Sequence, residues 1–126
     1  MELVNIKIEE FKDSLYNEYI NIFPLDEQRD WNNIIRTYNE GIEKFYKIVN
    51  ENNIVGFIML EENINSNSYY IDYIAILPQY RNKGYGTNAI KLLLNNIVKD
   101  KLLCIEIESP NIDNYETIKR RDFYTS

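Results

Sequence analysis

Apolar and polar positions along this chain follow two periods, and together they predict a succession of short strands and helices. Alternation of apolar and polar residues marks strands, and apolar residues recurring every three or four positions mark helices. The segments predicted as strands are 3–8, 45–49, 54–60, 69–77 and 102–107. The segments predicted as helices are 11–22, a second helix that ends at Gly41, 87–98 and 114–122.

The links between these segments predict a mixed sheet. Short polar turns join strands 45–49, 54–60 and 69–77, which is typical of antiparallel neighbours. The link from 69–77 to 102–107 runs through a helix, so we expect this pair to be parallel. The predicted fold class is therefore α+β, with antiparallel N-terminal strands and a parallel pair around one helix.

Length and apolar content predict one folded domain over residues 1–126. The chain has 126 residues, of which 44% are hydrophobic, which is enough for one core. It has no apolar run long enough to span a membrane, and its first residues lack the apolar core of a signal peptide. We therefore expect a cytoplasmic protein that does not bind membranes.

Composition excludes several kinds of chemistry. The chain has no histidine and only one cysteine, Cys104. A disulfide within the chain, the usual zinc sites and a Ser-His-Asp or Cys-His nucleophile are therefore excluded, and we expect no metal. A net charge of −6 also disfavours nucleic acid as a partner, because nucleic-acid binding requires a basic surface.

Gly84 and Gly86 stand one residue apart between a predicted strand and a predicted helix. The first amides of a helix have no acceptor within the helix, and the helix dipole is positive there. A phosphate can accept hydrogen bonds from these amides where glycine leaves its approach open. The neighbouring charged and polar side chains are Arg81, Asn82, Lys83 and Thr87. The loop is therefore predicted to bind a polyphosphate.

The same glycines leave a dinucleotide-binding domain as an alternative. The dinucleotide fingerprint Gly-x-Gly-x-x-Gly accepts alanine at its third position, where Ala89 stands. That fingerprint belongs to an N-terminal strand–helix–strand unit, with an acidic residue about 20 positions further on. Asp100 and Glu106 are the nearest carboxylates to that position. A purely structural role of the two glycines in starting and packing the helix is also open.

The segment IDYIAILPQYRNKGYGTNAIKLLL resembles the acetyl-CoA-binding motif of the GNAT family, the GCN5-related N-acetyltransferases. In that family an apolar strand end precedes Arg/Gln-x-x-Gly-x-Gly/Ala and a helix. The match here is Ala75 to Pro78 followed by Arg81 to Gly86, and the order of elements agrees over nearly the whole chain. The resemblance implies a GNAT-like fold and direct transfer of an acetyl group from acetyl-CoA to a primary amine, with a small amine as the expected partner.

The resemblance also implies where acetyl-CoA binds. Its pyrophosphate would lie on the amides from Asn82 to Thr87, and its pantetheine arm would pair with strand backbone where segments 69–77 and 102–107 separate. The cofactor-binding residues implied in this way are Ile74, Ala75, Ile76, Arg81, Asn82, Lys83, Gly84, Tyr85, Gly86 and Thr87.

Two catalytic residues are implied by the same resemblance. Related enzymes often carry a carboxylate on the strand before the motif, where Asp72 stands, and regular alternation would place it on one face with Ile74 and Ile76. Glu106 and Glu108 are competing candidates for this base. A tyrosine near the C-terminus acts as the acid in the family, and Tyr124 matches it. A phenol suits reprotonation of the CoA thiolate.

The sequence departs from the family pattern at its end. The Gly-Phe that should follow the tyrosine, and the last two strands of the family, are absent from a sequence that stops at Ser126. An open sheet edge invites pairing with another copy, so a homodimer is an expectation. The alternative to an active enzyme is therefore a catalytically impaired CoA-binding or interaction module.

Overall fold

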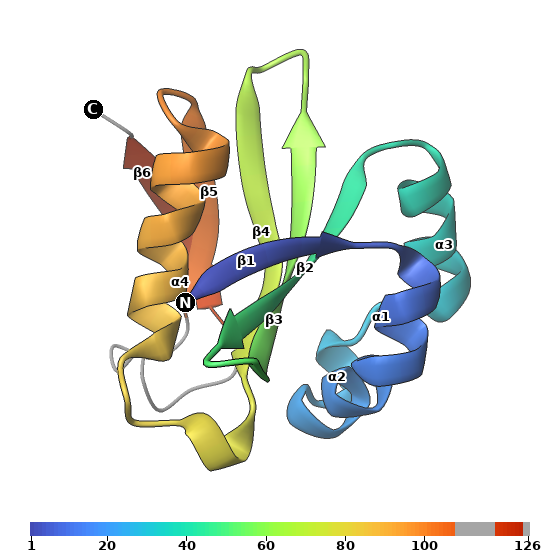
Figure 1. Cartoon of the computed structure of the whole chain (residues 1–126). Helices are drawn as coiled ribbons and strands as arrows, with labels where there is room; N and C mark the ends of the chain where they lie inside the picture. The colour runs from blue at the N-terminus through green and yellow to red at the C-terminus, as the bar shows by residue number, and fades with distance from the viewer. Residues whose placement is uncertain (108–117, 125–126) are drawn as a thin grey trace.

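The chain folds around a six-stranded mixed sheet in the order β1-β2-β3-β4-β5-β6 (Figure 1). The computed structural model describes residues 1–107 and 118–124. The strands are β1 (Glu2–Ile6), β2 (Glu43–Asn50), β3 (Asn53–Asn63), β4 (Ser68–Ile76), β5 (Leu102–Ile107) and β6 (Ile118–Tyr124). The helices are α1 (Ile8–Ser14), α2 (Tyr16–Ile22), α3 (Trp31–Asn39) and α4 (Tyr85–Leu93), with 3₁₀ turns η1 (Leu25–Glu27) and η2 (Pro78–Tyr80) and a π-helical turn η3 (Leu94–Val98).

The predicted α+β class and its strand directions are confirmed. The pairs from β1 to β4 are antiparallel, and β4 pairs with β5 in parallel through the crossover formed by α4. The predicted helix over 11–22 is two short helices, because the chain turns at the buried Leu15. Within the described residues, no helix has the length and apolar character needed to cross a bilayer.

The predicted helix over 114–122 is wrong where the structure describes it, because β6 occupies Ile118–Tyr124. Residues 114–117 lie outside the described part. β6 pairs antiparallel with β5, from Ile107 opposite Ile118 to Leu102 opposite Tyr124. An unpaired β5 edge would leave a row of backbone donors and acceptors without partners. β6 forms because it pairs with the backbone of β5, and the pattern of apolar and polar residues in 118–124 does not predict this pairing.

Helices cover both faces of the sheet and create two apolar cores. On one face α4 packs Ala89, Ile90 and Leu93 against inward side chains of β2, β3 and β4. On the other face α1, α2 and α3 pack an aromatic-rich cluster that includes Phe11 and Tyr19. Figure 1 shows α4 and the three N-terminal helices on opposite sides of the central strands. The sheet therefore separates the loop before α4 from the α3 side.

A β-bulge at Asp72 changes the course of β4. Met59 of β3 lies opposite Tyr73, whereas the next residue, Leu60, lies opposite Ile71, which leaves Asp72 as the extra residue. Parallel pairing with β5 runs from Ser68 to Ile71 and ends there. A bulge bends its strand and increases the local twist, which accounts for the separation of β4 from β5 at this point. The two strands thus diverge where the chemistry was predicted.

Candidate active site

The loop before α4 presents backbone amides without protein caps. Gly84 is the N-cap of α4, and among the described residues no side-chain cap accepts a hydrogen bond from the first turn. Asn82 and Gly84 take positive φ values of 66° and 77°, and Lys83 between them does not. Backbone that turns sharply in this way can direct successive N–H groups toward one point and favour an anion there. This geometry fits the predicted diphosphate cradle.

Gly84 and Gly86 serve this loop in different ways. A Cβ atom built on Gly84 would meet no protein atom within 4 Å, so the space in front of it is open. Gly86 is buried in the first turn of α4, next to the helix–sheet core. Glycine at 84 therefore allows a left-handed backbone and an open approach, whereas glycine at 86 belongs to the packed side of the helix.

Some of the other predicted loop residues form hydrogen bonds that hold the loop in place, and others are exposed to solvent. Arg81 Nε donates to the carbonyl of Ile76 at 3.0 Å, which fastens the loop to the end of β4. Tyr85 accepts a hydrogen bond from Asn50 Nδ2 at 3.2 Å. Lys83 is exposed, and Thr87 is half-buried in the first turn of α4. Arg81 thus has a structural anchor besides its predicted electrostatic role.

The edge of β4 from Ile74 to Ile76 is not paired with β5 in the described chain. Ile74 packs on the α4 side and Ala75 on the opposite side, so backbone groups rather than side chains line the edge between β4 and β5. A free strand edge is a template for pairing with an extended partner. The predicted site for the pantetheine arm therefore has the geometry that pairing requires.

Asp72 does not share a face with Ile74 and Ile76, so this part of the prediction is wrong. The bulge interrupts the alternation, and Ile71 and Ile74 both pack on the α4 side. Asp72 instead meets Arg29, whose Nη1 donates to Asp72 Oδ2 at 2.5 Å. In a regular strand, alternate residues point to opposite faces of the sheet. One inserted residue exchanges the two faces for the residues that follow it.

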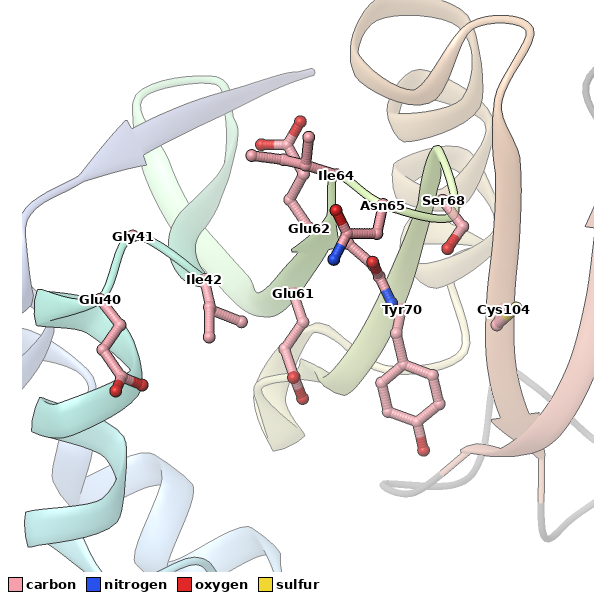
Figure 2. Close-up of a pocket in the computed structure, with 11 residues that line it drawn as sticks. Glu40, Gly41, Ile42, Glu61, Glu62, Ile64, Asn65, Ser68, Tyr70 and Cys104 are labelled. Carbon is pink, nitrogen blue, oxygen red and sulfur yellow. The ribbon is translucent and has the colours of Figure 1, made fainter.

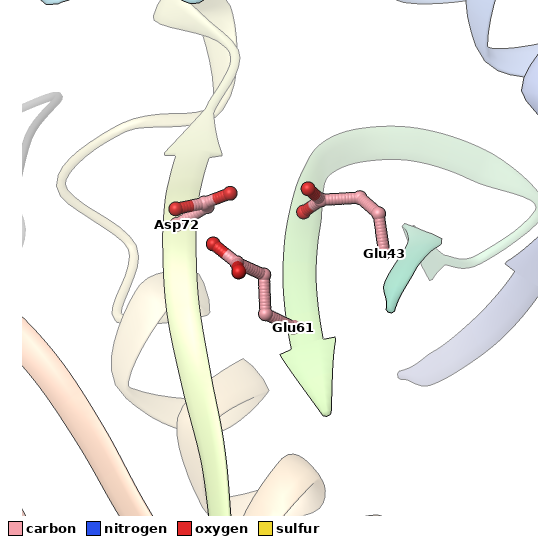
Figure 3. A group of neighbouring side chains, drawn as sticks. All are labelled: Glu43, Glu61 and Asp72. Carbon is pink, nitrogen blue, oxygen red and sulfur yellow. The ribbon is translucent and has the colours of Figure 1, made fainter. Parts of the chain in front are cut away.

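Three carboxylates gather on the α3 side of the sheet at the bulge: Glu43, Glu61 and Asp72. Glu43 of β2 and Glu61 of β3 are cross-strand partners, and the bulge brings Asp72 of β4 beside them. One oxygen from each lies within 4.8 Å of the others, and Figure 3 shows the carboxylates of Glu61 and Asp72 side by side. Arg29 donates to Glu43 as well as to Asp72. Three carboxylates at this spacing favour a positive charge among them, and the guanidinium of Arg29 provides that charge.

Burial makes these carboxylates unusually basic. Burial and the nearby Glu43 carboxylate raise the pKa of Asp72 to about 7. Burial also raises the pKa of Glu61 to about 7, and the adjacent Asp72 adds to the rise. The pKa of Glu43 is raised by burial as well. A carboxylate with a pKa near neutral is suited to accept and release a proton in catalysis. Sequence analysis missed Glu61 because only the fold places it beside Asp72.

A pocket of about 980 Å³ opens next to Glu61, at the end of β3 and the start of β4. This volume lies in the range of small-molecule sites. In Figure 2 the side chains of Glu61 and Tyr70 extend to the same side, whereas that of Glu62 points the other way. The lining residues are Glu40, Gly41, Ile42, Glu61, Glu62, Asn63, Ile64, Asn65, Ser68, Tyr70 and Cys104. The pocket therefore gives a small ligand access to the edge of the carboxylate group.

The remaining candidates lie on β5, on β6 or between them. Tyr124 ends β6 opposite Leu102, and its side chain lies outside the described part. The same holds for the side chain of Glu106, and Glu108 falls entirely outside the described residues. In this register Tyr124 lies level with Leu102 and Ser68, at the end of the β4–β5 pair away from the free β4 edge, and the position of its side chain stays a prediction.

The family assignment follows from the sequence as a whole. Residues 8–123 match the sequence model of the acetyltransferase (GNAT) family. The chain belongs to the GNAT family. Membership supports an acetyl-transfer function for this GNAT chain, and it accords with the open amides before α4 and the divergence of β4 from β5.

A solved structure agrees with this GNAT fold. A GNAT-family protein from Bacteroides thetaiotaomicron superimposes with a TM-score of 0.70 at 23% sequence identity. The match covers 87% of this chain and 62% of that one, so this chain spans less than two thirds of its length. At this identity the likeness concerns the fold. No curated protein matches the chain.

The carboxylate group of this GNAT domain predicts that stability decreases as pH rises. Asp72 and Glu61 have pKa values of about 7 in the fold, above their ordinary 3.8 and 4.5. The folded state therefore binds more protons than the unfolded chain between these limits. The free energy of unfolding should fall as pH rises from 5 to 7, by up to about 1.4 kcal/mol per pH unit for each proton.

Thermal unfolding monitored by circular dichroism at several pH values checks this expectation. Asp72→Asn should flatten the dependence, because it removes one of the two titrating groups. Glu10→Gln, which alters an exposed carboxylate paired with Lys47, is the matched control and should keep the slope of the parent. A melting temperature that is constant or rises between pH 5 and 7 would contradict the expectation.

Proposed function

We propose that this GNAT domain transfers the acetyl group of acetyl-CoA directly to the primary amine of a small molecule. One observation carries the proposal: the free edge of β4 runs from the uncapped amides before α4 to the bulge at Asp72, beside which Glu61 lines a pocket. Acetyl-CoA has a diphosphate, then an extended pantetheine arm, then the thioester that reacts. The glycine loop, the free β4 edge and the carboxylate group follow one another in the same order. Family membership supports the same activity.

The residues present fit acetyl-CoA. The open space before Gly84 admits a phosphate, and the left-handed backbone at Asn82 and Gly84 turns amides toward it. The backbone of Ile74 to Ile76 offers an edge for the pantetheine arm. Acetyl-CoA supplies the acetyl group as a thioester. We assign the first part of the binding to Asn82, Lys83, Gly84, Tyr85, Gly86 and Thr87, with Arg81 holding the loop in place.

Glu61 acts as the general base of this proposal, with Asp72 behind it. An amine attacks only as the neutral species, so a proton must leave the ammonium, and Glu61 at the edge of the pocket accepts it. The amine nitrogen then forms a bond to the acetyl carbon while the bond from that carbon to sulfur breaks. Tyr124 donates its phenolic proton to the departing thiolate and takes up the second proton that the acylated nitrogen releases. No covalent bond to the protein forms at any step.

The proposal is tested by binding and turnover together. Isothermal titration with acetyl-CoA should give one site, and release of CoA thiol should accompany acetylation of at least one amine from a panel of small amines. Absence of acetyl-CoA binding would refute the proposal. Binding without turnover of any amine would favour the alternative, a CoA-binding or interaction module, above all if the chain is a dimer in solution.

The dinucleotide-binding alternative makes a different prediction from the same loop. It expects affinity for NAD and indifference to CoA. In this fold the glycine loop follows the central β4 and not an N-terminal strand, whereas the dinucleotide fingerprint belongs to the first strand–helix–strand unit. Titration with NAD alongside acetyl-CoA separates the two. A cytoplasmic location stays a prediction.

Tyr124→Phe tests the assignment of the acid. The phenylalanine variant keeps the ring and loses the proton donor, so turnover should fall by about 100-fold or more. The affinity for acetyl-CoA should stay within about twofold, because the assigned role concerns the leaving thiolate. Steady-state kinetics and calorimetry of parent and variant give both values. A variant that turns over like the parent would show that Tyr124 is not the acid.

A further inference from the structure

The group formed by Glu43, Asp72 and Glu61 contains more negative charge than its cation can balance. Arg29 lies just before α3 and donates from Nη1 to Glu43 and Asp72. Its Nη2 donates to Thr37 Oγ1 at 2.8 Å. With all three carboxylates ionised, the group would carry two negative charges in excess of the one guanidinium.

Glu43 is the most deeply enclosed member of the group. Its side chain is 0% exposed, and its Oε1 accepts hydrogen bonds from Arg29 and Thr37. Its Oε2 is buried, and in the described part of the chain no donor reaches it. A buried carboxylate oxygen without a donor costs several kcal/mol. A proton held by a neighbouring carboxyl would supply the donor that this oxygen lacks.

Within residues 1–104, the neighbours from other elements do not supply a second positive charge. Tyr19 of α2 and Tyr73 of β4 are the other titratable side chains that act on the group, and burial raises the pKa of both phenols. They are therefore neutral near pH 7. Asp72 interacts with both of the other carboxylates. A proton is the simplest remaining way to reduce the charge.

We propose that Glu43, Asp72 and Glu61 hold one proton between them near neutral pH, and that Arg29 and Glu43 are positioning residues that set, in opposite directions, the pH at which this proton leaves. The guanidinium favours the ionised group and so promotes release. The buried Glu43 carboxylate opposes a further negative charge and so retains the proton. One consequence rests on the proposed function: Glu61 can accept the proton of the amine only after the carboxylate group has released its own.

Carboxyl-detected NMR of the ¹³C-labelled full chain tests the shared proton without any activity. The resonances of Asp72 and Glu61 should shift together with one midpoint near pH 7, where their pKa values lie. Spectra of Asp72→Asn and Glu61→Gln assign the signals. If all three carboxyls complete their titration below about pH 5, as ordinary carboxylates do, the proposal is overturned.

Two variants test the opposite roles of Arg29 and Glu43. Glu43→Gln should lower the midpoint of the remaining pair, and Arg29→Gln should raise it, each by about one pH unit or more. A merely structural role would lower the melting temperature in both variants and leave the midpoint in place. Thr37→Val is the control, because it removes a hydrogen-bond partner of both residues without changing charge. Shifts in the same direction would overturn the proposal, and if a variant does not fold, the titration of the parent decides.

The pH dependence of kcat/KM connects the shared proton to acetyl transfer. Its acidic limb should follow the NMR midpoint in the parent, in Glu43→Gln and in Arg29→Gln. A limb that stays fixed while the midpoint moves would overturn the positioning roles of these residues. A chain that acetylates no amine would refute the proposed function, and the NMR titration would still decide whether the proton is shared.

Discussion

Replacement of Gly84 by valine is expected to reduce acetyl-CoA affinity by about 100-fold or more. Gly84 has φ +77°, and the space in front of its Cα is open. A valine side chain would occupy the approach to the amides and disfavour the left-handed backbone. Loss of two charge-assisted hydrogen bonds at about 1.5 kcal/mol each corresponds to about 100-fold in affinity. Isothermal titration with acetyl-CoA measures the change.

The chain offers a matched control for this substitution. Gly41 has φ +78°, and a Cβ atom there would also meet nothing within 4 Å, but Gly41 follows α3 and lies by the pocket of Glu61. Gly41→Val should therefore lower stability about as much as Gly84→Val while acetyl-CoA affinity stays near that of the parent. Equal loss of affinity in both variants would show that backbone strain, and not a blocked phosphate site, explains the effect.

Glu61→Gln is expected to lower kcat by about 100- to 10,000-fold, the range for loss of a general base. Glutamine has the size of glutamate and cannot accept the amine proton. Burial and Asp72 give Glu61 its pKa of about 7, so this carboxylate is suited to proton transfer near neutral pH. Acetyl-CoA affinity should change little, because the glycine loop lies at the opposite end of the free β4 edge.

The measurement combines steady-state kinetics with calorimetry at pH values from 6 to 9. The rate should recover in part at high pH, where more of the amine is neutral without help from the protein. Glu10→Gln, at an exposed position that does not line the pocket, should leave kcat unchanged. If Glu61→Gln matches the parent in kcat at pH 7, the base is another group.

Much of this fold is predictable from the sequence because its signals are local. The parallel pair and the glycine loop follow from element order and from two glycines at the start of a helix. β6 was not predicted, because a strand at a sheet edge forms to satisfy the backbone of its neighbour and not through its own periodicity. Long-range pairing decides such segments.

The candidate site divides in the same way. The loop from Arg81 to Thr87 is continuous in sequence, so its role in phosphate binding is open to prediction. The carboxylate group joins Arg29, Glu43, Glu61 and Asp72 from separate elements, and one inserted residue in β4 turns Asp72 to the other face. Regular alternation along β4 predicts the wrong face of the sheet for Asp72, because no residue type between Ile71 and Ile74 indicates a bulge.

The bulge also affects how related sequences should be aligned with this one. Before Asp72 the odd-numbered residues of β4 face α4, and after it the even-numbered residues do. An alignment that places a one-residue gap on the wrong side of this position exchanges the side chains that face α4 with those that face the N-terminal helices over half of the strand. Comparisons of this chain with its homologues therefore need a structural superposition through β4, because a consensus built from sequence columns alone would mix two different faces.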